Sequence, residues 1–170
     1  GGRSGIGQYA IQMLRQFPVL EPQARFEACV LESEREVFTP AGSPLTPLCF
    51  PNRLGSPVVN LAWHTARLPH WCKARRFDVL FLPAGNRRAP VWAPCPAVGT
   101  VHDFSSIHLK GKYDPLRMVF ITRVVPFLAR RLTHIITVSE SSKRDIVEFA
   151  RIPAERITVI PQAADTSLYY

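Results

Sequence analysis

Apolar positions along the chain fall into two alternating patterns. Short, uninterrupted runs rich in β-branched residues are typical of buried strands. Longer segments with apolar residues on one side are typical of helices that pack on a sheet. The strand-like runs comprise residues 24–32, 78–83, 97–101, 135–138 and 157–160.

The helical pattern appears in four longer segments. They comprise a stretch near the start with Ile11, Leu14 and Phe17 on one side, and residues 58–75, 115–132 and 139–150. Pro69 should interrupt the second helix and Pro126 should kink the third, because proline lacks the N–H of the helical ladder. The proline-rich segment 39–57 has no periodicity and is predicted to be a loop with short extended pieces.

Residues 133–165 are central to the predicted fold. Their pattern predicts a strand, a helix and a second strand within about thirty residues. Ser139 is a natural N-cap with Glu140 in the first turn, and Pro153 should stop the helix. Such a unit has parallel strands and a right-handed crossover. Since strand and helix alternate along all 170 residues, we predict an α/β fold with one parallel sheet, helices on both faces and a single domain over residues 1–170.

Two groups of polar residues follow predicted strands, and ligands of open α/β sheets bind beyond the carboxyl ends of strands. His102 and Asp103 end the run 97–101, where the ring can bind a ligand hydroxyl and Asp103 can fix the ring or cap the next turn. A histidine satisfied by its own backbone is the alternative. Asn86, Arg87 and Arg88 follow the run 78–83 and are candidates for binding a substrate, although an exposed, solvated arginine pair is at least as good an explanation.

The chain begins with four glycines in seven residues, at positions 1, 2, 5 and 7, ahead of the first helix. Their spacing matches neither a P-loop nor a dinucleotide fingerprint. Glycines before a helix N-terminus allow backbone N–H groups to approach a phosphate or a sugar closely, so Gly5 and Gly7 are candidate binding positions. A plain turn between a strand and a helix is the alternative.

The net charge indicates a class of binding partner, and the cysteine content indicates a cellular compartment. The net charge of +8 calls for an anionic partner, which nucleic acid, anionic lipid or a nucleotide can supply. Basic residues interleave with apolar ones over residues 110–131, a pattern that can rest on anionic lipid, although burial explains most of the apolar ones. The basic residues are Lys110, Lys112, Arg117, Arg123, Arg130 and Arg131.

Four well-separated cysteines predict no metal site, and no apolar run reaches the length of a bilayer span. Cys29 and Cys72 are expected to be small core residues, and reduced thiols indicate the cytoplasm.

Three stretches together resemble one enzyme family. The opening G-R-S-G-I-G-Q-Y-A, the segment V-G-T-V-H-D-F around His102, and most of residues 133–165 are similar to the N-terminal domain of family 4 retaining glycosyltransferases. The strand D-V-L-F-L-P also resembles the family. In the family this region usually closes with Pro-Asn-Gly-Val-Asp. This chain departs from that motif, because Gln162, Ala163 and Ala164 stand between Pro161 and Asp165.

The resemblance implies a Rossmann-like sheet that forms half of a two-domain GT-B enzyme. It implies transfer of a sugar, hexosyl or mannosyl in type, from a nucleotide-sugar to a glycan or lipid-linked acceptor with retention of configuration, and no metal cofactor. His102 and Asp103 would be catalytic, Gly5, Gly7 and Ser139 would bind the donor, and Asn86, Arg87 and Arg88 would bind the acceptor.

In the family a strand precedes the glycine loop and a second domain carries most donor contacts. We therefore expect this chain to lack that strand and that domain, and to be inactive alone. The implied location is the cytoplasm, with peripheral contact to the inner face of the membrane.

Two other function classes stay open. A non-catalytic basic α/β module that binds anionic membrane or nucleic acid fits the charge, although the chain has no nucleic-acid motif and its Arg and Lys are dispersed. An unrelated α/β enzyme that uses His102 and Asp103 as a catalytic pair would need a nucleophile, and no G-x-S-x-G elbow is present.

Overall fold

The computed structural model describes residues 4–85, 88–104 and 114–163. The chain divides into two compact units, Gly1–Trp63 and His64–Tyr170.

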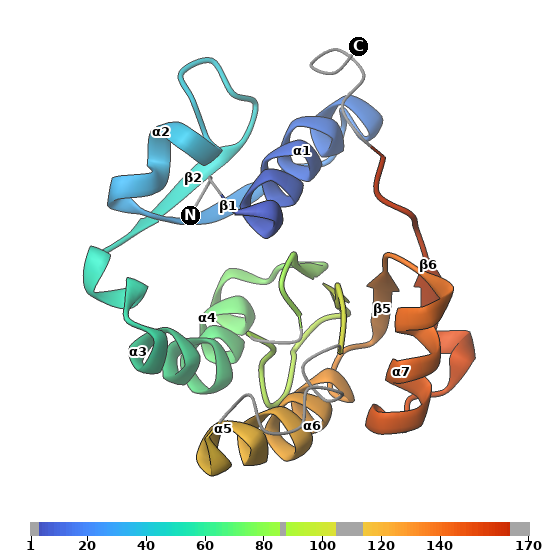
Figure 1. Cartoon of the computed structure of the whole chain (residues 1–170). Coiled ribbons are helices and arrows are strands. Elements are labelled where there is room, and N and C mark those ends of the chain that lie inside the picture. The colour runs from blue at the N-terminus through green and yellow to red at the C-terminus, as the bar shows by residue number, and fades with distance from the viewer. Residues whose placement is uncertain (1–3, 86–87, 105–113, 164–170) are drawn as a thin grey trace. The chain divides into compact units, whose positions relative to one another are not determined.

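The first unit pairs two parallel strands with short helices (Figure 1). Strands β1 and β2 align with Glu27 opposite Thr46. Ser4 caps the first helix, because its Oγ accepts the N–H of Gly7 at 3.1 Å. The elements are α1 (Gly5–Leu20), β1 (Glu27–Leu31), η1 (Glu32–Glu34), α2 (Arg35–Phe38), β2 (Thr46–Phe50), η2 (Asn52–Gly55) and α3 (Pro57–Ala62).

Helix α1 packs through the side that the sequence pattern indicates. Ile11 is buried, and Phe17 stacks on Phe26 with ring centroids 6.0 Å apart. Gly7 and Ala10 lie on the same buried side, where small residues permit close packing. The glycines at positions 5 and 7 therefore belong to the helix itself, whereas the sequence suggested a flexible turn before it.

The second unit contains a four-stranded parallel sheet in the order β3-β4-β5-β6. Figure 1 labels β5 and β6 of this sheet, next to α7. Ile135 and Val101 are completely buried, and so are Leu128, Leu132 and Ile146 of the covering segments. Segment η3 (Trp63–Arg67) spans the boundary between the units. The other elements are α4 (Leu68–Arg75), β3 (Leu80–Leu82), β4 (Ala97–Thr100), α5 (Pro115–Val119), η5 (Phe120–Val124), α6 (Val125–Ala129), β5 (His134–Thr137), α7 (Glu140–Ala150), η6 (Ala154–Arg156) and β6 (Ile157–Val159).

The predicted α/β class with parallel strands and interleaved helices is confirmed. All five predicted strands are present. Four are shorter than predicted, and β5 has the predicted length but starts one residue earlier. Two details differ. The described strands form two sheets rather than one, and the predicted loop 39–57 contains the full strand β2. Pro47 hides that strand in the sequence, since proline is tolerated only at a sheet edge or bulge.

The helix departs from regular α geometry near both prolines, and it does so in the same form. A five-residue π-helical segment precedes each proline, and the proline then occupies the first turn of the next α-helix. Pro69 follows η3, and Pro126 follows η5. Wider π turns are a common way for a helix to accommodate a residue that cannot donate to the ladder.

A close contact between two glycines fixes the loop after β3 against β4. The N–H of Gly85 donates to the carbonyl of Thr100 at 2.9 Å, which extends the pairing beyond β3. A Cβ atom on Gly99 would lie 2.6 Å from Cδ1 of Leu132, and one on Gly85 would lie 3.0 Å from Cα of Gly99. Only glycine permits this approach, which brings the end of β3 beside the end of β4.

The cysteines follow the prediction only in part. Cys72 is buried as expected, whereas Cys29 is exposed because it lies on the outer side of β1, between the buried Ala28 and Val30. None of these four cysteines, all within the described residues, forms a disulfide. Burial, and then the neighbouring Cys95, raise the pKa of Cys72 to about 11, so this thiol stays protonated at neutral pH.

Candidate functional site

The candidate site lies at the carboxyl edge of the four-stranded sheet. Because the four strands are parallel, the residues that follow β3, β4, β5 and β6 all lie along this edge. These are Pro83, then His102 and Asp103, then Ser139, and finally Gln162. The edge therefore gathers polar groups from segments that lie far apart in the sequence.

His102 is held in place by buried neighbours and by its own ring. Val101 is completely buried and Phe104 is 3% exposed, so the chain on either side of His102 is anchored in the core. The half-buried ring places Nε2 at 3.0 Å from the carbonyl oxygen of Pro83. Its other nitrogen, Nδ1, lies 3.2 Å from the side-chain nitrogen of Gln162.

A hydroxyl network links the main chain of His102 to the start of α7. Ser139 is the N-cap, and its Oγ accepts the N–H of Ser142 at 3.1 Å. The Ser139 hydroxyl also bonds that of Ser142, which donates in turn to the carbonyl of His102 at 3.1 Å. The positive end of the helix dipole is thereby fixed beside the end of β4.

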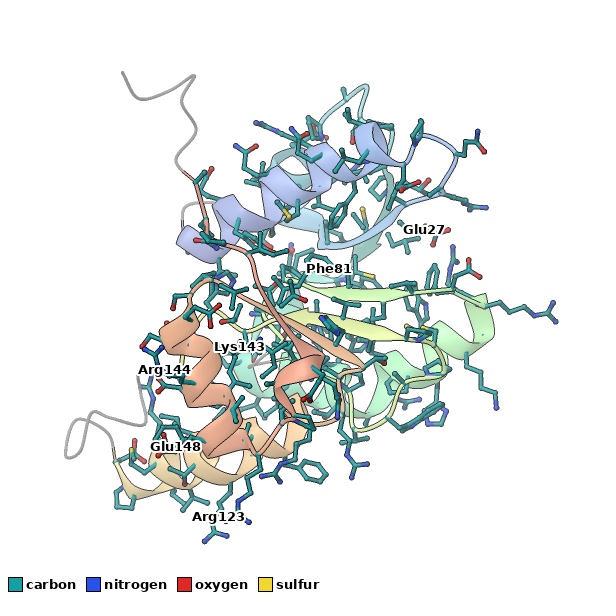
Figure 2. All side chains as sticks on the ribbon, turned by 90° about the vertical axis from the view of Figure 1, so that its right-hand side faces the viewer. Glu27, Phe81, Arg123, Lys143, Arg144 and Glu148 are labelled. Carbon is teal, nitrogen blue, oxygen red and sulfur yellow. The ribbon has the colours of Figure 1, made fainter. Side chains whose placement is uncertain are left out.

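Contacts along α7 fix the helix that carries this N-cap. Lys143 donates from Nζ to the carbonyl of Ile157 at 3.0 Å, which ties α7 to β6. Figure 2 labels Lys143 and Arg144 in the first half of α7 and Glu148 in the second half. The end of the helix that faces the site is therefore supported by the strand beside it.

Of the residues that the sequence singled out, the structure brings His102, Asp103 and Ser139 to one place. Asp103 follows His102 directly and is exposed. Arg88 is exposed in the loop after β3. Asn86 and Arg87 lie outside the described residues.

Gly5 and Gly7 belong to the first unit and occupy the first turn of α1. Gly5 is exposed, and a Cβ atom added to it would meet nothing within 4 Å. Gly7 is buried, and its N–H is used by Ser4. Of the two, only Gly7 is buried.

Sequence reasoning missed three groups that touch the site residues. Gln162 appeared only as a departure from the family's usual residue, and Ser142 and the carbonyl of Pro83 were not considered. Ser142 lies three residues after the N-cap, a position where a side chain faces back toward the helix start, and this spacing is the only clue in the sequence. No comparable clue points to Gln162.

The described residues contain no cluster of side chains that could hold a metal ion. Among residues 4–85, 88–104 and 114–163, no three His, Cys, Asp or Glu side chains gather in a way that could hold a metal ion. None of the helices in those ranges is long and apolar enough to cross a membrane. The arrangement at the sheet edge can make hydrogen bonds to a polar ligand through an imidazole, a carboxylate and hydroxyl groups.

Comparison with models of known protein families gives a match. The sequence profile of the family described as Glycosyltransferase Family 4 covers residues 5–168. No curated protein matches the chain.

Proposed function

This chain belongs to glycosyltransferase family 4, a family of retaining glycosyltransferases, and on that premise we propose that it forms the acceptor-side domain of an enzyme that moves a sugar from a nucleotide-sugar to an acceptor. The observation that supports this role most strongly is the position of His102. It follows β4 at the carboxyl edge of the parallel sheet, and its main-chain carbonyl accepts from Ser142 in the first turn of α7. Ligands of open α/β sheets bind at this edge.

In the proposed reaction, the leaving phosphate of the donor is stabilised by electrostatics rather than by a side-chain nucleophile. Retention is then explained by attack of the acceptor on the face that the phosphate leaves, with the phosphate accepting the acceptor's proton. The dipole at the N-terminal end of α7 and its Ser139 cap favour a negative charge nearby. His102 would hydrogen-bond a sugar hydroxyl that takes the place of the exposed Gln162 amide at Nδ1, and Asp103 would orient the polar groups around it.

We also propose binding roles for the remaining candidate residues. Gly5 and Gly7 would allow the start of α1 to approach the donor, in the way that glycines at helix starts approach phosphates and sugars. Arg88, together with Asn86 and Arg87 outside the described residues, would meet the acceptor. Cationic side chains suit an acceptor that carries phosphate, as a lipid-linked sugar or a charged glycan does.

A second domain is part of this proposal. A transition state for sugar transfer must be held from both sides, and the family resemblance assigns most donor contacts to the other half of a GT-B enzyme. We therefore propose that residues 1–170 alone do not turn over a nucleotide-sugar, and that catalysis takes place in the cytoplasm in the full-length protein.

Contact with an anionic membrane is a second candidate role, and a specific surface favours it. Leu116 is 83% exposed and Val119 is 56% exposed on the helical segments that carry Arg117 and Arg123. Apolar side chains among guanidinium groups suit the interface of an anionic bilayer. Lys110 and Lys112, which the sequence adds to this surface, lie outside the described residues. The same surface on a non-catalytic module is the alternative function.

The experiment that tests the enzymatic role compares two histidines of the same sheet. His102 lies at the carboxyl edge, whereas His134 starts β5 at the opposite edge and bonds the hydroxyl of Thr158 at 2.8 Å. In the full-length protein, His102→Ala should lower turnover about tenfold or more, the order of one good hydrogen bond made in the transition state. His134→Ala should leave turnover within about twofold of wild type, because it lies away from the proposed site.

Steady-state kinetics with UDP- and GDP-linked hexoses as probes, and melting temperatures as the folding control, give the comparison. Equal losses of turnover in both variants, or full turnover in His102→Ala, would contradict the proposed role of His102.

A further inference from the structure

A cavity of about 380 Å³ lies at the C-terminal end of α7, at the other end of the helix from the candidate site. Its volume falls within the range of small-molecule sites. The helix has 11 residues, so its two ends are about 16 Å apart. The residues that line the cavity are Thr122, Arg123, Pro126, Arg130, Phe149 and Arg151. A ligand in this cavity therefore uses different groups from a ligand at the sheet edge.

Three guanidinium groups from separate segments surround the cavity. Arg123 belongs to η5, Arg130 follows α6, and Arg151 follows α7. All three residues are exposed, so a ligand can reach them from solvent. Among residues 4–85, 88–104 and 114–163, no carboxylate forms an ion pair with any of the three, although Glu148 lies on the adjoining turn of α7. No acidic side chain in those ranges therefore neutralises this charge by direct contact.

Arg130 is already held in position. Its Nε donates to the carbonyl of Ala150 at 2.6 Å, and its own carbonyl accepts from Arg156 at 3.2 Å. The bond to Ala150 uses one nitrogen, and a guanidinium has two more that can donate. A side chain that is fixed beforehand loses less freedom when a ligand binds, which favours affinity.

The charge of the cavity suits a doubly negative group. The three arginines contribute +3, and the carbonyl ends of α6 and α7 each contribute up to about −0.5, which leaves about +2. A phosphate monoester carries about −1.5 to −2 at neutral pH. Guanidinium groups bind phosphate through paired, charge-assisted hydrogen bonds. We propose that this cavity is a binding site for a phosphate monoester, carried by a small molecule or by a lipid headgroup.

This site differs from the surface for which we proposed contact with a membrane. Arg123 belongs to both, because it also lies near the exposed Leu116 and Val119 in the sequence. Arg151 lies on another segment and belongs to the cavity alone. Substitution of Arg151 therefore distinguishes a defined phosphate site from general attraction to an anionic surface.

The test measures binding of two phosphate monoesters to the full-length protein. The soluble probe is glycerol 3-phosphate, followed by calorimetry. The lipid probe is phosphatidic acid in phosphatidylcholine vesicles, followed by sedimentation. Arg123→Gln and Arg151→Gln should each weaken binding about tenfold, the order of one charge-assisted hydrogen bond.

Each variant has a matched control in the same unit. Arg76 is exposed and follows α4 in the left-handed conformation that Arg151 adopts after α7, with φ of 55° and 51° respectively. Arg144 is exposed on α7 and does not line the cavity (Figure 2). Arg76→Gln and Arg144→Gln make the same change in net charge, and they should leave binding within about twofold of wild type because salt screens distant charges.

The two probes identify the source of the phosphate. Binding of glycerol 3-phosphate that depends on the cavity arginines would support a soluble ligand, whereas binding of the vesicles alone, with the same dependence, would support a lipid headgroup. Absence of saturable binding to both probes, or equal losses in cavity and control variants, would overturn the proposal. A loss in Arg123→Gln without a loss in Arg151→Gln would also overturn it, because the surface with Leu116 and Val119 would then explain the binding.

The result is independent of sugar transfer. All four arginines are exposed, so the glutamine variants should fold, and melting temperatures check this. Because binding is measured without turnover, a failure of sugar transfer would bear on the proposed function alone.

Discussion

The two ends of helix α7 contact the rest of the second unit through different kinds of side chain. At the N-terminal end the contacts are neutral hydroxyls, those of Ser139 and Ser142, and they lead to His102. At the C-terminal end the contact is cationic, since Nε of Arg130 donates to the carbonyl of Ala150 at 2.6 Å. Each end thus receives the groups that its unsatisfied backbone atoms require.

Beside the C-terminal end lies an open cavity of about 380 Å³. Its lining comprises Thr122, Arg123, Pro126, Arg130, Phe149 and Arg151. Figure 2 labels Arg123 below Glu148, on the segment that packs near this end of α7. The cavity has more positive charge than the sheet edge, yet the bond of Arg130 shows that part of this charge serves the helix end. Positive charge alone therefore does not distinguish a ligand site from a helix terminus that is capped by arginine.

The largest effect on folding should come from the N-terminal end. Ser139→Ala removes the oxygen that accepts the N–H of Ser142, and we expect a loss of about 1 kcal/mol in the free energy of unfolding. Ser141→Ala is the matched control, because Ser141 is exposed in the same turn and should change stability by less than about 0.5 kcal/mol. Urea unfolding of both variants measures the difference, and equal values would show that the cap contributes nothing.

A slightly smaller effect is expected at the C-terminal end. Arg130→Met keeps most of the side-chain length but removes the donor to Ala150, which should cost about 0.5–1 kcal/mol. Arg123→Met removes the same charge from the same cavity and should cost less, because the bond to Ala150 remains. If the Arg123 variant loses as much stability as the Arg130 variant in thermal unfolding, a general charge effect rather than capping explains the loss.

A substitution at the residue after α7 should stabilise the protein. Arg151 adopts a left-handed backbone with φ of 51°, which side chains with a Cβ atom disfavour. Arg151→Gly should therefore raise the free energy of unfolding by about 0.5 kcal/mol. Arg151→Ala separates the causes, since it removes the guanidinium but keeps the strain and should give no gain. A gain in both variants would assign the effect to charge.

The smallest effect concerns the basic surface. We expect weak binding of the protein to vesicles that contain phosphatidylserine, and this binding should decline as salt screens the arginines. Replacing Arg117 and Arg131 together by glutamine should reduce the bound fraction, whereas Arg25→Gln and Arg35→Gln, exposed positions of the first unit, should reduce it less. Equal sedimentation with neutral and anionic vesicles would leave these arginines as ordinary surface charge.

Much of the second unit follows from its sequence, because its strands are short and buried. The run around Ile135 and the run that ends at Val101 are apolar and β-branched, so local pattern alone identifies them. Strand β2 of the first unit has no such pattern, and Pro47 within it argues against a strand. The partition of the strands into two sheets depends on pairing between distant segments, which local pattern does not determine.

The candidate site likewise has one part that the sequence predicts and one part that it does not. His102, Asp103 and Ser139 follow predicted strands, so the rule for parallel sheets brings them to one edge. The partner of the His102 ring, Gln162, is sixty positions away in the sequence, and its side chain looks like an ordinary exposed amide. Its relation to His102 depends on rotamers and on the path of the chain after β6, and only a three-dimensional structure contains that information.

In the proposed function, the N-terminal end of α7 and His102 belong to a site for retaining sugar transfer. The most direct measurement is the anomeric configuration of the product that the full-length protein forms, read by NMR, with α-linked UDP- and GDP-hexoses as probes. We predict transfer that gives an α-linked product, as membership of family 4 requires. A β-linked product would contradict the account, since it would mean inversion at the reacting carbon.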